Sequence, residues 1–328
     1  MTSRYVLRSK NQSSALEDLT PVESLFCYVS LCVCVCGCIQ TCLIVLTALL
    51  IMTIRGSKLA FISLLLYAAL ALHPIRYGKP WSAFINSWIF DVWRKYFAFT
   101  WVNYARLEKG QRYMFFEFPH AIFPMGQFLS ASVVRDVFPD DTFCGIGADI
   151  VFYFPIYRHI MSWLGTYPAT RKNITRILDS GCCCTVLPGG IAEMYLCRSD
   201  KEGIYFRKRR NTVKAALQEG AHVVPAFFYG NSRIFSPMGT EGGNQSILSW
   251  FSRKMRAAIV FYTGRNYLPV PFRQPLKMCI GAPIHVDRAY PNPTEEQIDE
   301  LQKKIIDAVT KLYEENRPEW ETKELMIT

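Results

Sequence analysis

The sequence lacks the motifs by which several large enzyme classes are recognised. Gly145 and Gly147 are not followed by the third glycine of a dinucleotide-binding loop, and no P-loop occurs. The segment 230–234 (GNSRI) lacks the second glycine of a nucleophile elbow. There is no CxxC pair and no Cys/His cluster with zinc-finger spacing, so we predict no structural metal site. We also find no internal repeat.

Charge is scarce as well, and most of it is basic. Only 20% of the 328 residues are charged, and 37 Lys and Arg against 27 Asp and Glu give a net charge of +10. Half of the chain is hydrophobic, and the mean hydropathy is +0.10. This composition excludes intrinsic disorder, and the absence of a Gly/Pro period excludes a collagen-like fibre. Basic charge combined with high hydropathy favours association with a membrane rather than with nucleic acid, for which no motif is present.

Two uncharged apolar runs near the N-terminus give this membrane prediction a location. Residues 26–54 form a run of 29 residues without a charge, and residues 59–72 form a second run of 14. About 20 apolar residues span a bilayer core, so the first run is long enough to cross and the second is short. Arg55 and Lys58 lie between them. The sequence therefore predicts a transmembrane or re-entrant helical hairpin over residues 26–72, with a single span as the alternative.

Basic residues flank the apolar region on both sides, which places both flanks on the cytosolic side of the membrane. We therefore expect a cytosolic N-terminal tail at residues 1–25 and a cytosolic domain at residues 73–328. Six of the twelve cysteines lie in the apolar run, where they are interpreted as small hydrophobic side chains in lipid; palmitoylation or metal sensing is the alternative.

Residues 73–328 alternate between strand-like and helix-like segments. Candidate strands at residues 112–118, 182–187, 222–229 and 276–280 are rich in β-branched and aromatic residues. Candidate helices lie between them at residues 171–178 and 209–219, the latter followed by Gly220 as a C-terminal cap. Strands separated by helices at this spacing are typical of βαβ units. The fold class expected is α/β, with a mixed sheet flanked by helices.

A late helix has the clearest local signals in the chain. Thr294 and Gln297 have the spacing of a capping box, and Pro318 marks the end of the helix. Five apolar residues in between repeat at helical spacing, which predicts a stripe that packs on the core. They are Ile298, Leu301, Ile305, Val309 and Leu312.

Three short motifs are candidates for the chemistry. The first, Glu117-Phe118-Pro119-His120, follows a candidate strand, where a histidine is well placed to act as a general base. The second is residues 188–193 (PGGIAE), whose two glycines allow close approach of a ligand to the backbone and whose Glu193 adds a carboxylate. The third is a basic run that can pair with phosphates or with a membrane surface. It comprises Arg207, Lys208, Arg209 and Arg210.

Five sequence blocks, in order, resemble the type-2 diacylglycerol acyltransferase family, which also contains monoacylglycerol acyltransferases and wax synthases. The first resembles the family's HPHG block in its plant-type EPHS form, and the third matches its PGGxxE motif. The resemblance covers roughly residues 75–325. The blocks are EFPHAIFPMG (117–126), RHIMSWLGTYPATRKNITRILDSG (158–181), LPGGIAE (187–193), RKRRNTVKAALQEGAHVVPAFFYG (207–230) and GRNYLPVPFRQPLKMCIGAPI (264–284).

The resemblance implies a glycerolipid-acyltransferase-like α/β domain in the endoplasmic reticulum membrane, with lipid droplets as a second location. It implies transfer of an acyl group from acyl-CoA to diacylglycerol, without a further cofactor. Monoacylglycerol or a fatty alcohol as acceptor, and a non-catalytic lipid-binding protein, are the alternatives; a homo-oligomer is left open. The implied catalytic residues are His120 as general base and Glu193; the substrate-binding residues are Pro119, Gly189, Gly190 and Arg207 to Arg210; Arg158 and His159 are secondary candidates.

The sequence departs from related patterns at two positions beside His120. The wider glycerolipid acyltransferase superfamily has an Asp five positions after its His, where this chain has Met125. The glycine that usually follows the motif histidine is replaced by Ala121, which we expect to alter local backbone freedom. The residue that orients His120 is therefore not predicted by the sequence.

Overall fold

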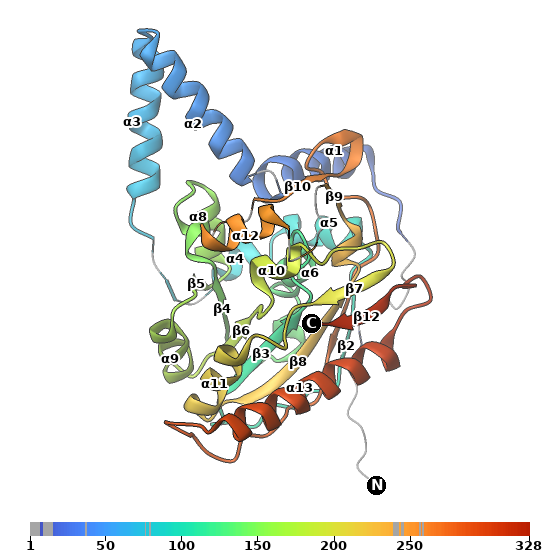
Figure 1. Ribbon diagram of the computed structural model, residues 1–328. Helices are drawn as coiled ribbons and strands as arrows, with labels where there is room; N and C mark the ends of the chain where they lie inside the picture. The colour runs from blue at the N-terminus through green and yellow to red at the C-terminus, as the bar shows by residue number, and fades with distance from the viewer. Residues whose placement is uncertain are drawn as a thin grey trace.

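A mixed sheet of eight strands runs through the centre of the molecule (Figure 1). The computed structural model describes residues 7–8, 16–36, 38–75, 77–78, 80–238, 243, 246–255, 257 and 259–328, with the side chains of residues 7–8 and 34–41 excepted. Thirteen of the 25 residues of the predicted N-terminal tail therefore lie outside the described residues. The side chains of Cys34, Cys36 and Cys38, which are predicted to lie in lipid, are among those excepted. The strand order is β1-β2-β11-β8-β3-β6-β4-β5.

The centre of this sheet is parallel. β3 pairs in parallel with β8 on one side and with β6 on the other, and β4 and β5 continue the parallel block. β11 is antiparallel to β8, so the sheet is mixed, as the sequence predicts. Two further pairs, β9 with β10 and β7 with β12, lie outside it. The strands are β1 (Leu7–Arg8), β2 (Thr100–Asn103), β3 (Tyr113–Phe118), β4 (Phe143–Gly147), β5 (Thr166–Pro168), β6 (Cys183–Val186), β7 (Lys201–Ile204), β8 (His222–Tyr229), β9 (Ser236–Met238), β10 (Phe261–Thr263), β11 (Lys277–Ile280) and β12 (Glu324–Ile327).

Helices cover both faces of the sheet, and two separate apolar clusters lie between them and the strands. On β3, Tyr113 and Phe115 belong to one cluster, while Met114, Phe116 and Phe118 belong to the other, because successive side chains of a strand point to opposite faces. The helices are α1 (Pro21–Ser30), α2 (Cys38–Ile54), α3 (Lys58–Leu72), α4 (Ser82–Ile85), α5 (Trp88–Tyr96), α6 (Met125–Ser130), α7 (Val134–Val137), α8 (Tyr157–Trp163), α9 (Arg171–Asp179), α10 (Gly190–Met194), α11 (Arg210–Glu219), α12 (Ile247–Lys254) and α13 (Glu295–Asn316), with a π-helical turn, η1 (Leu31–Cys36), and 3-10 turns η2 (Asp149–Phe152), η3 (Asn231–Arg233) and η5 (Arg265–Tyr267).

The secondary structure predicted for the α/β domain is confirmed. The four predicted strands correspond to β3, β6, β8 and β11, and the predicted helices to α9, α11 and α13. Gly220 caps α11 in the left-handed conformation, with φ of 59°. Thr294 and Gln297 form the predicted capping box, and the five apolar residues of α13 are buried against the sheet.

The beginning of the long apolar run does not belong to the hairpin. Cys27 and Leu31 are fully buried against α5, and the Trp93 indole donates to the Ser30 hydroxyl at 3.0 Å. The Cys27 thiol donates to the carbonyl of Val92. Residues 21–31 therefore pack on the α/β domain, and the boundary predicted at residue 26 differs from the structure, in which the hairpin starts with α2.

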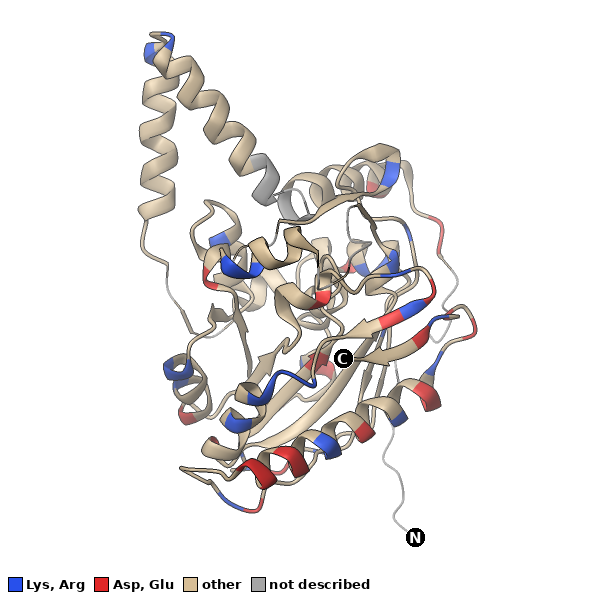
Figure 2. Ribbon diagram, viewed as in Figure 1, with Lys and Arg blue, Asp and Glu red and all other residues tan. Residues whose placement is uncertain are grey.

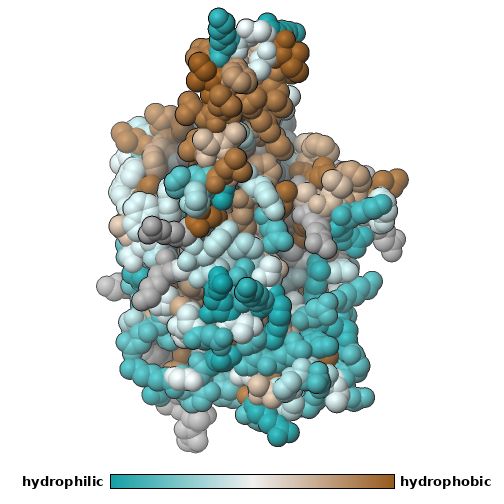
Figure 3. All heavy atoms as spheres, turned by 90° about the vertical axis from the view of Figure 1, so that its left-hand side faces the viewer, coloured by the Kyte–Doolittle hydropathy of each residue, from teal (hydrophilic) through white to brown (hydrophobic). Residues whose placement is uncertain are grey.

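The hairpin itself is formed by α2 and α3, which project from one end of the molecule (Figure 1). Its sides carry no charge, and its two basic residues, Arg55 and Lys58, lie at the tip (Figure 2). Large apolar side chains are exposed along both helices, including Ile54 and Leu59 (Figure 3). In the part of the chain that the structure describes, no helix is both long enough and apolar enough to cross a membrane.

Candidate active site

The first sequence motif forms a loop at the carboxyl end of β3, the strand between β8 and β6. The Phe118–Pro119 peptide is cis, and the Pro119 carbonyl turns toward two amide side chains. Gln127 and Asn231 donate to this carbonyl at 3.1 and 3.3 Å, and they are bonded to each other at 2.7 Å. These contacts join β3, α6 and the end of β8, and they fix the loop immediately before His120.

The His120 side chain is held in one orientation by the next residue. Its Nδ1 lies 2.9 Å from the Ala121 carbonyl oxygen, which can only accept, so Nδ1 carries the proton. The lone pair of the neutral ring is then on Nε2. Burial lowers the pKa of His120 below its ordinary value of 6.5 and keeps the ring neutral near pH 7. The ring is therefore in the protonation state that a general base requires.

Ala121 provides this carbonyl because its backbone is left-handed, with φ of 52°. Glycine adopts that conformation at no steric cost, whereas other residues do so at about 1–2 kcal/mol. The prediction that alanine in the glycine position alters backbone freedom is consistent with this geometry. Ala121 is nearly fully buried, so surrounding packing holds it in place.

Glu193 holds the backbone on the other side of His120. Its carboxylate accepts from the His120 backbone N–H at 2.6 Å and from the Tyr205 backbone N–H at 2.9 Å, and the residue is 1% exposed. Burial raises the pKa of Glu193 to about 8, against the opposing effect of these two bonds. Glu193 and the Ala121 carbonyl together orient His120, which the sequence leaves open. These contacts suit a positioning residue, and the catalytic role that the resemblance implies for Glu193 stays a prediction.

The two glycines of the PGGxxE motif are required for different reasons. A Cβ on Gly189 would lie 2.2 Å from the Glu193 carboxylate, so this glycine leaves room for that side chain rather than for a ligand. Gly190 has φ of 54°, a conformation that favours glycine, and it lines the cavity described below. The predicted close approach to a ligand is therefore available at Gly190.

The basic run does not form a single cluster, because each side chain points in its own direction. Arg209 turns inward: its Nη2 donates to the Gly189 carbonyl at 2.5 Å, and its guanidinium lies over the Tyr205 ring. Its buried Nε has no hydrogen-bond partner among the described residues. Arg210 forms ion pairs with Glu295 and Asp299 of α13 instead. Arg207 donates to the Ile327 carbonyl, and Lys208 is exposed.

A cavity of about 930 Å³ opens beside His120. Its walls are mostly apolar, and Leu43 of α2 also lines it, so the base of the hairpin borders the cavity. Neither Arg158 nor His159 lines it. His159 faces His73 and Trp163 instead, with ring centroids 6.1 and 6.3 Å away. The apolar part of the lining includes Ile122, Phe123, Phe128, Tyr157, Met161 and Ile191.

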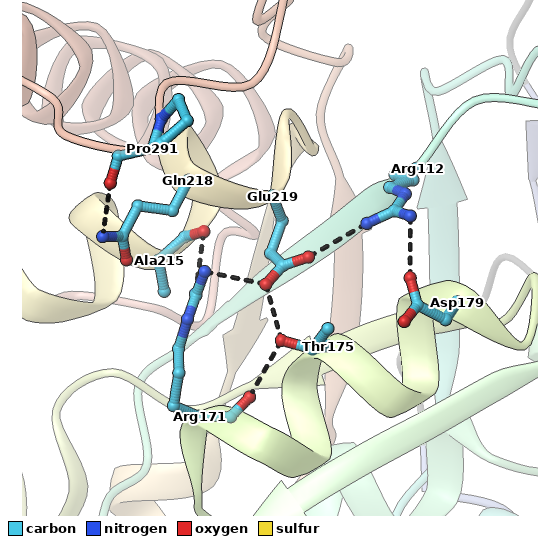
Figure 4. A network of polar contacts seen from close by, with 8 residues as sticks. All are labelled: Arg112, Arg171, Thr175, Asp179, Ala215, Gln218, Glu219 and Pro291. Carbon is cyan, nitrogen blue, oxygen red and sulfur yellow. Dashed lines mark hydrogen bonds and ion pairs between the residues drawn. The ribbon is translucent and has the colours of Figure 1, made fainter.

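A network of ion pairs includes Arg171, which contributes to the wall of the cavity (Figure 4). The Glu219 carboxylate, whose side chain is 8% exposed, bonds to Arg112 at 2.9 Å, to Arg171 at 2.7 Å and to the Thr175 hydroxyl at 2.6 Å. Arg112 also pairs with Asp179. The network ties the start of β3 to α9 and α11.

Several residues of the site were not identified from the sequence. Gln127 and Asn231 donate to the Pro119 carbonyl from 8 and 112 positions away, and Tyr205 donates only its backbone N–H, to Glu193. None of these contacts has a recognisable sequence motif. Glu117 is different, because it belongs to the first motif and an acidic residue in a buried strand is unusual. That signal was available, although it did not indicate a role.

Comparisons with known proteins agree with the sequence blocks. The family model described as "Diacylglycerol acyltransferase" matches residues 49–327. The human diacylglycerol O-acyltransferase 2-like protein 6 is 27% identical over 274 residues, which are 76% of this chain and 81% of that protein. Bovine 2-acylglycerol O-acyltransferase 1 is 26% identical, over 73% of this chain and 76% of its own. A crystal structure of the 1-acyl-sn-glycerophosphate acyltransferase PlsC from Thermotoga maritima aligns with a TM-score of 0.37 and 14% identity, over 64% of this chain and 68% of that one.

Proposed function

Since the chain belongs to the diacylglycerol acyltransferase family and is an acyltransferase, we propose that it transfers the acyl group of an acyl-CoA to the free hydroxyl of diacylglycerol. The product is triacylglycerol. The observation that most supports this reaction is a neutral histidine beside an apolar cavity large enough for acyl chains. The Nε2 lone pair of this histidine has no partner among the described residues. The similarity to a 2-acylglycerol acyltransferase makes monoacylglycerol the second candidate acceptor.

In the proposed reaction, His120 supplies the base that the alcohol needs. The pKa of an alcohol lies far above 7, so Nε2 takes the hydroxyl proton while the oxygen attacks the thioester carbonyl. The tetrahedral intermediate then breaks its C–S bond, and the proton passes from the imidazolium to the departing CoA thiolate. No covalent acyl-enzyme is required, because the thioester is already activated. During these steps Glu193 holds the loop in one conformation by accepting from the His120 N–H.

Arg209 is our candidate among the basic run for contact with the acyl-CoA. It borders the site through Gly189, and its buried Nε has a hydrogen-bonding capacity that the described residues do not use. Arg210 is already paired with two carboxylates of α13. We expect Arg209→Ala to raise the KM for acyl-CoA several-fold more than Arg210→Ala. Equal effects of the two substitutions would contradict this assignment.

We place the protein at the endoplasmic reticulum membrane, with the hairpin in the bilayer and the α/β domain in the cytosol. Helices of 17 and 15 residues are about 22–26 Å long at 1.5 Å per residue, compared with a bilayer core of about 30 Å. Such lengths favour a re-entrant hairpin with Arg55 and Lys58 near the far headgroups. Exposed apolar residues of α1 and α12 lie at the same end of the molecule (Figure 1). Leu65→Arg with Leu66→Arg should reduce flotation with liposomes, while a normal yield in the floating fraction would contradict this placement.

A panel of acceptors tests the proposed reaction. Microsomes containing the full chain receive labelled acyl-CoA with diacylglycerol, monoacylglycerol, a fatty alcohol or a sterol, and the products are separated. Triacylglycerol should be the main labelled product. His120→Gln should lower its rate by roughly 10²- to 10⁴-fold, the usual contribution of a general base. His159→Gln is the matched control and should keep most of the rate. No labelled ester from any acceptor, with folded protein present, would refute the proposal.

A further inference from the structure

Glu117 places a carboxyl group inside the cavity, three residues before His120. It is the fifth residue of β3, and its neighbours of the same face, Tyr113 and Phe115, belong to the apolar cluster on the cavity side. Its partner across the β3–β8 pairing, Ala226, belongs to the same cluster. Glu117 itself lines the cavity and is 7% exposed. Strand alternation and the cavity lining thus agree on the direction of this side chain.

No described residue forms a hydrogen bond or an ion pair with this carboxyl group. This is unusual, because buried polar groups in proteins are nearly always paired. The cavity wall also contains other charged or titratable residues, and none of them perturbs the pKa of Glu117. They are His120, Arg135, Asp141, Tyr157, Arg171 and Tyr262.

Burial alone raises the pKa of Glu117 to about 8, so the group is mostly protonated at neutral pH. A protonated carboxyl group has one O–H donor, and nothing in the described cavity wall accepts from it. A partner must therefore come from the occupant of the cavity. The acceptor proposed above carries two kinds of polar group, its free hydroxyl, which faces His120, and its ester carbonyls, which can only accept.

We propose that Glu117 is a specificity-determining residue that donates a hydrogen bond to an ester carbonyl of the bound acylglycerol. The inference rests on the proposed function, because it names the feature of the acceptor that this site recognises. An acceptor with the same hydroxyl but without an ester carbonyl leaves the Glu117 O–H unpaired in an apolar cavity. A site of this kind discriminates against such an analogue, because the buried donor then has no partner.

A pair of acceptors that differ only in the carbonyl tests this proposal. Diacylglycerol and its ether analogue, 1,2-dialkylglycerol, have the same free hydroxyl and similar chains. We expect the unmodified chain to use the ester with a kcat/KM about ten-fold higher than the ether, from the cost of one unpaired buried donor. Glu117→Leu should bring this ratio close to one, whereas Glu117→Gln, which keeps an N–H donor, should preserve most of it. Thr185→Val, which changes another polar residue of the same wall, is the control and should leave the ratio unchanged.

The pH dependence of the ester-to-ether ratio shows whether Glu117 donates a hydrogen bond to the acceptor or has only a structural role. Between pH 7 and 9 the Glu117 O–H is lost, so the ester preference should fall in the unmodified chain and persist in Glu117→Gln. His120 stays neutral over this range, because its pKa is lowered. If Glu117→Leu does not fold, this comparison still tests the proposal. If the ester-to-ether ratio of kcat/KM changes neither with the substitution nor with pH, the proposal is overturned. Absence of turnover with every acceptor would instead refute the proposed function.

Discussion

Glu193→Gln is the substitution that most directly tests how the site is assembled. The glutamine has almost the same size and fits under Gly189, but one of its two terminal atoms is an NH2 group. Both carboxylate oxygens of Glu193 accept from backbone N–H groups, those of His120 and Tyr205. The amide can satisfy only one of them, and its NH2 must face the other donor.

The size of the effect follows from that mismatch. A buried N–H that loses its acceptor costs about 1–3 kcal/mol. We expect the free energy of unfolding to fall by this amount. If this cost falls on the His120 N–H, the population of the productive loop conformation decreases by roughly 5- to 150-fold, which is the same free energy expressed as a ratio. The kcat should decrease accordingly, while the KM for acyl-CoA changes little.

Glu202→Gln is a matched control for the loss of a buried carboxyl group. Glu202 is 2% exposed and accepts from the Ser232 hydroxyl at 2.6 Å, and burial raises its pKa to about 7. It does not line the cavity, and its hydrogen-bond partner Ser232 lies outside the His120 loop. Denaturant unfolding and initial rates are measured for both variants in the same detergent or lipid nanodiscs.

We expect both substitutions to lower stability and only Glu193→Gln to lower kcat strongly. The positioning role of Glu193 would be refuted if its variant kept the kcat of the unmodified chain. It would also be refuted if the two variants lost kcat to the same extent, because the loss would then reflect general destabilisation.

Two further predictions concern stability. Glu219→Gln should lower the free energy of unfolding by about 2 kcal/mol, because it leaves two arginines without their shared partner (Figure 4). Asp179 is exposed, so Asp179→Asn should lower the free energy of unfolding by less than about 1 kcal/mol. Equal urea midpoints for the two variants would contradict this. The chain should also lose stability as pH rises from 6 to 9. Burial raises the pKa of Glu117 and Glu193 to about 8 and that of Glu202 to about 7. The folded state therefore retains protons that the unfolded state releases near pH 4.5, and rising pH favours unfolding. Urea midpoints at pH 6 and 9 measure this, and a higher midpoint at pH 9 would show that these carboxyl groups ionise in the folded protein.

The secondary structure of the α/β domain could be predicted because its signals are local. The capping box at Thr294, the glycine after α11 and the short apolar strands each depend on neighbours within a few residues. The strand order could not be predicted in the same way. β3 lies between β6 and β8, which follow it by some 70 and 110 residues, and the pairing depends on packing across the whole domain.

The sequence indicated candidate residues for the site but not the contacts between them. His120 and Glu193 are 73 positions apart, and the sequence gives no indication that one carboxylate accepts from the other residue's backbone. The basic run illustrates the opposite error, because adjacent residues in a turn point in different directions. Arg209 reaches the Gly189 carbonyl, while Arg210 pairs with α13. Residues that are adjacent in the sequence can therefore have side chains that lie apart in the fold.

The buried carboxyl groups also bear on how an anionic co-substrate is tolerated here. Glu193 accepts from the His120 backbone N–H, and Glu117 lines the same cavity as His120. Two negative charges here would oppose the phosphates and the departing thiolate of an acyl-CoA. Because burial raises the pKa of both groups to about 8, much of that charge is absent near pH 7. Arg209, whose guanidinium borders Gly190, then contributes positive charge beside the site. The local electrostatics therefore favour an anion, even though two of the acidic residues of this chain lie within the motifs that form the site.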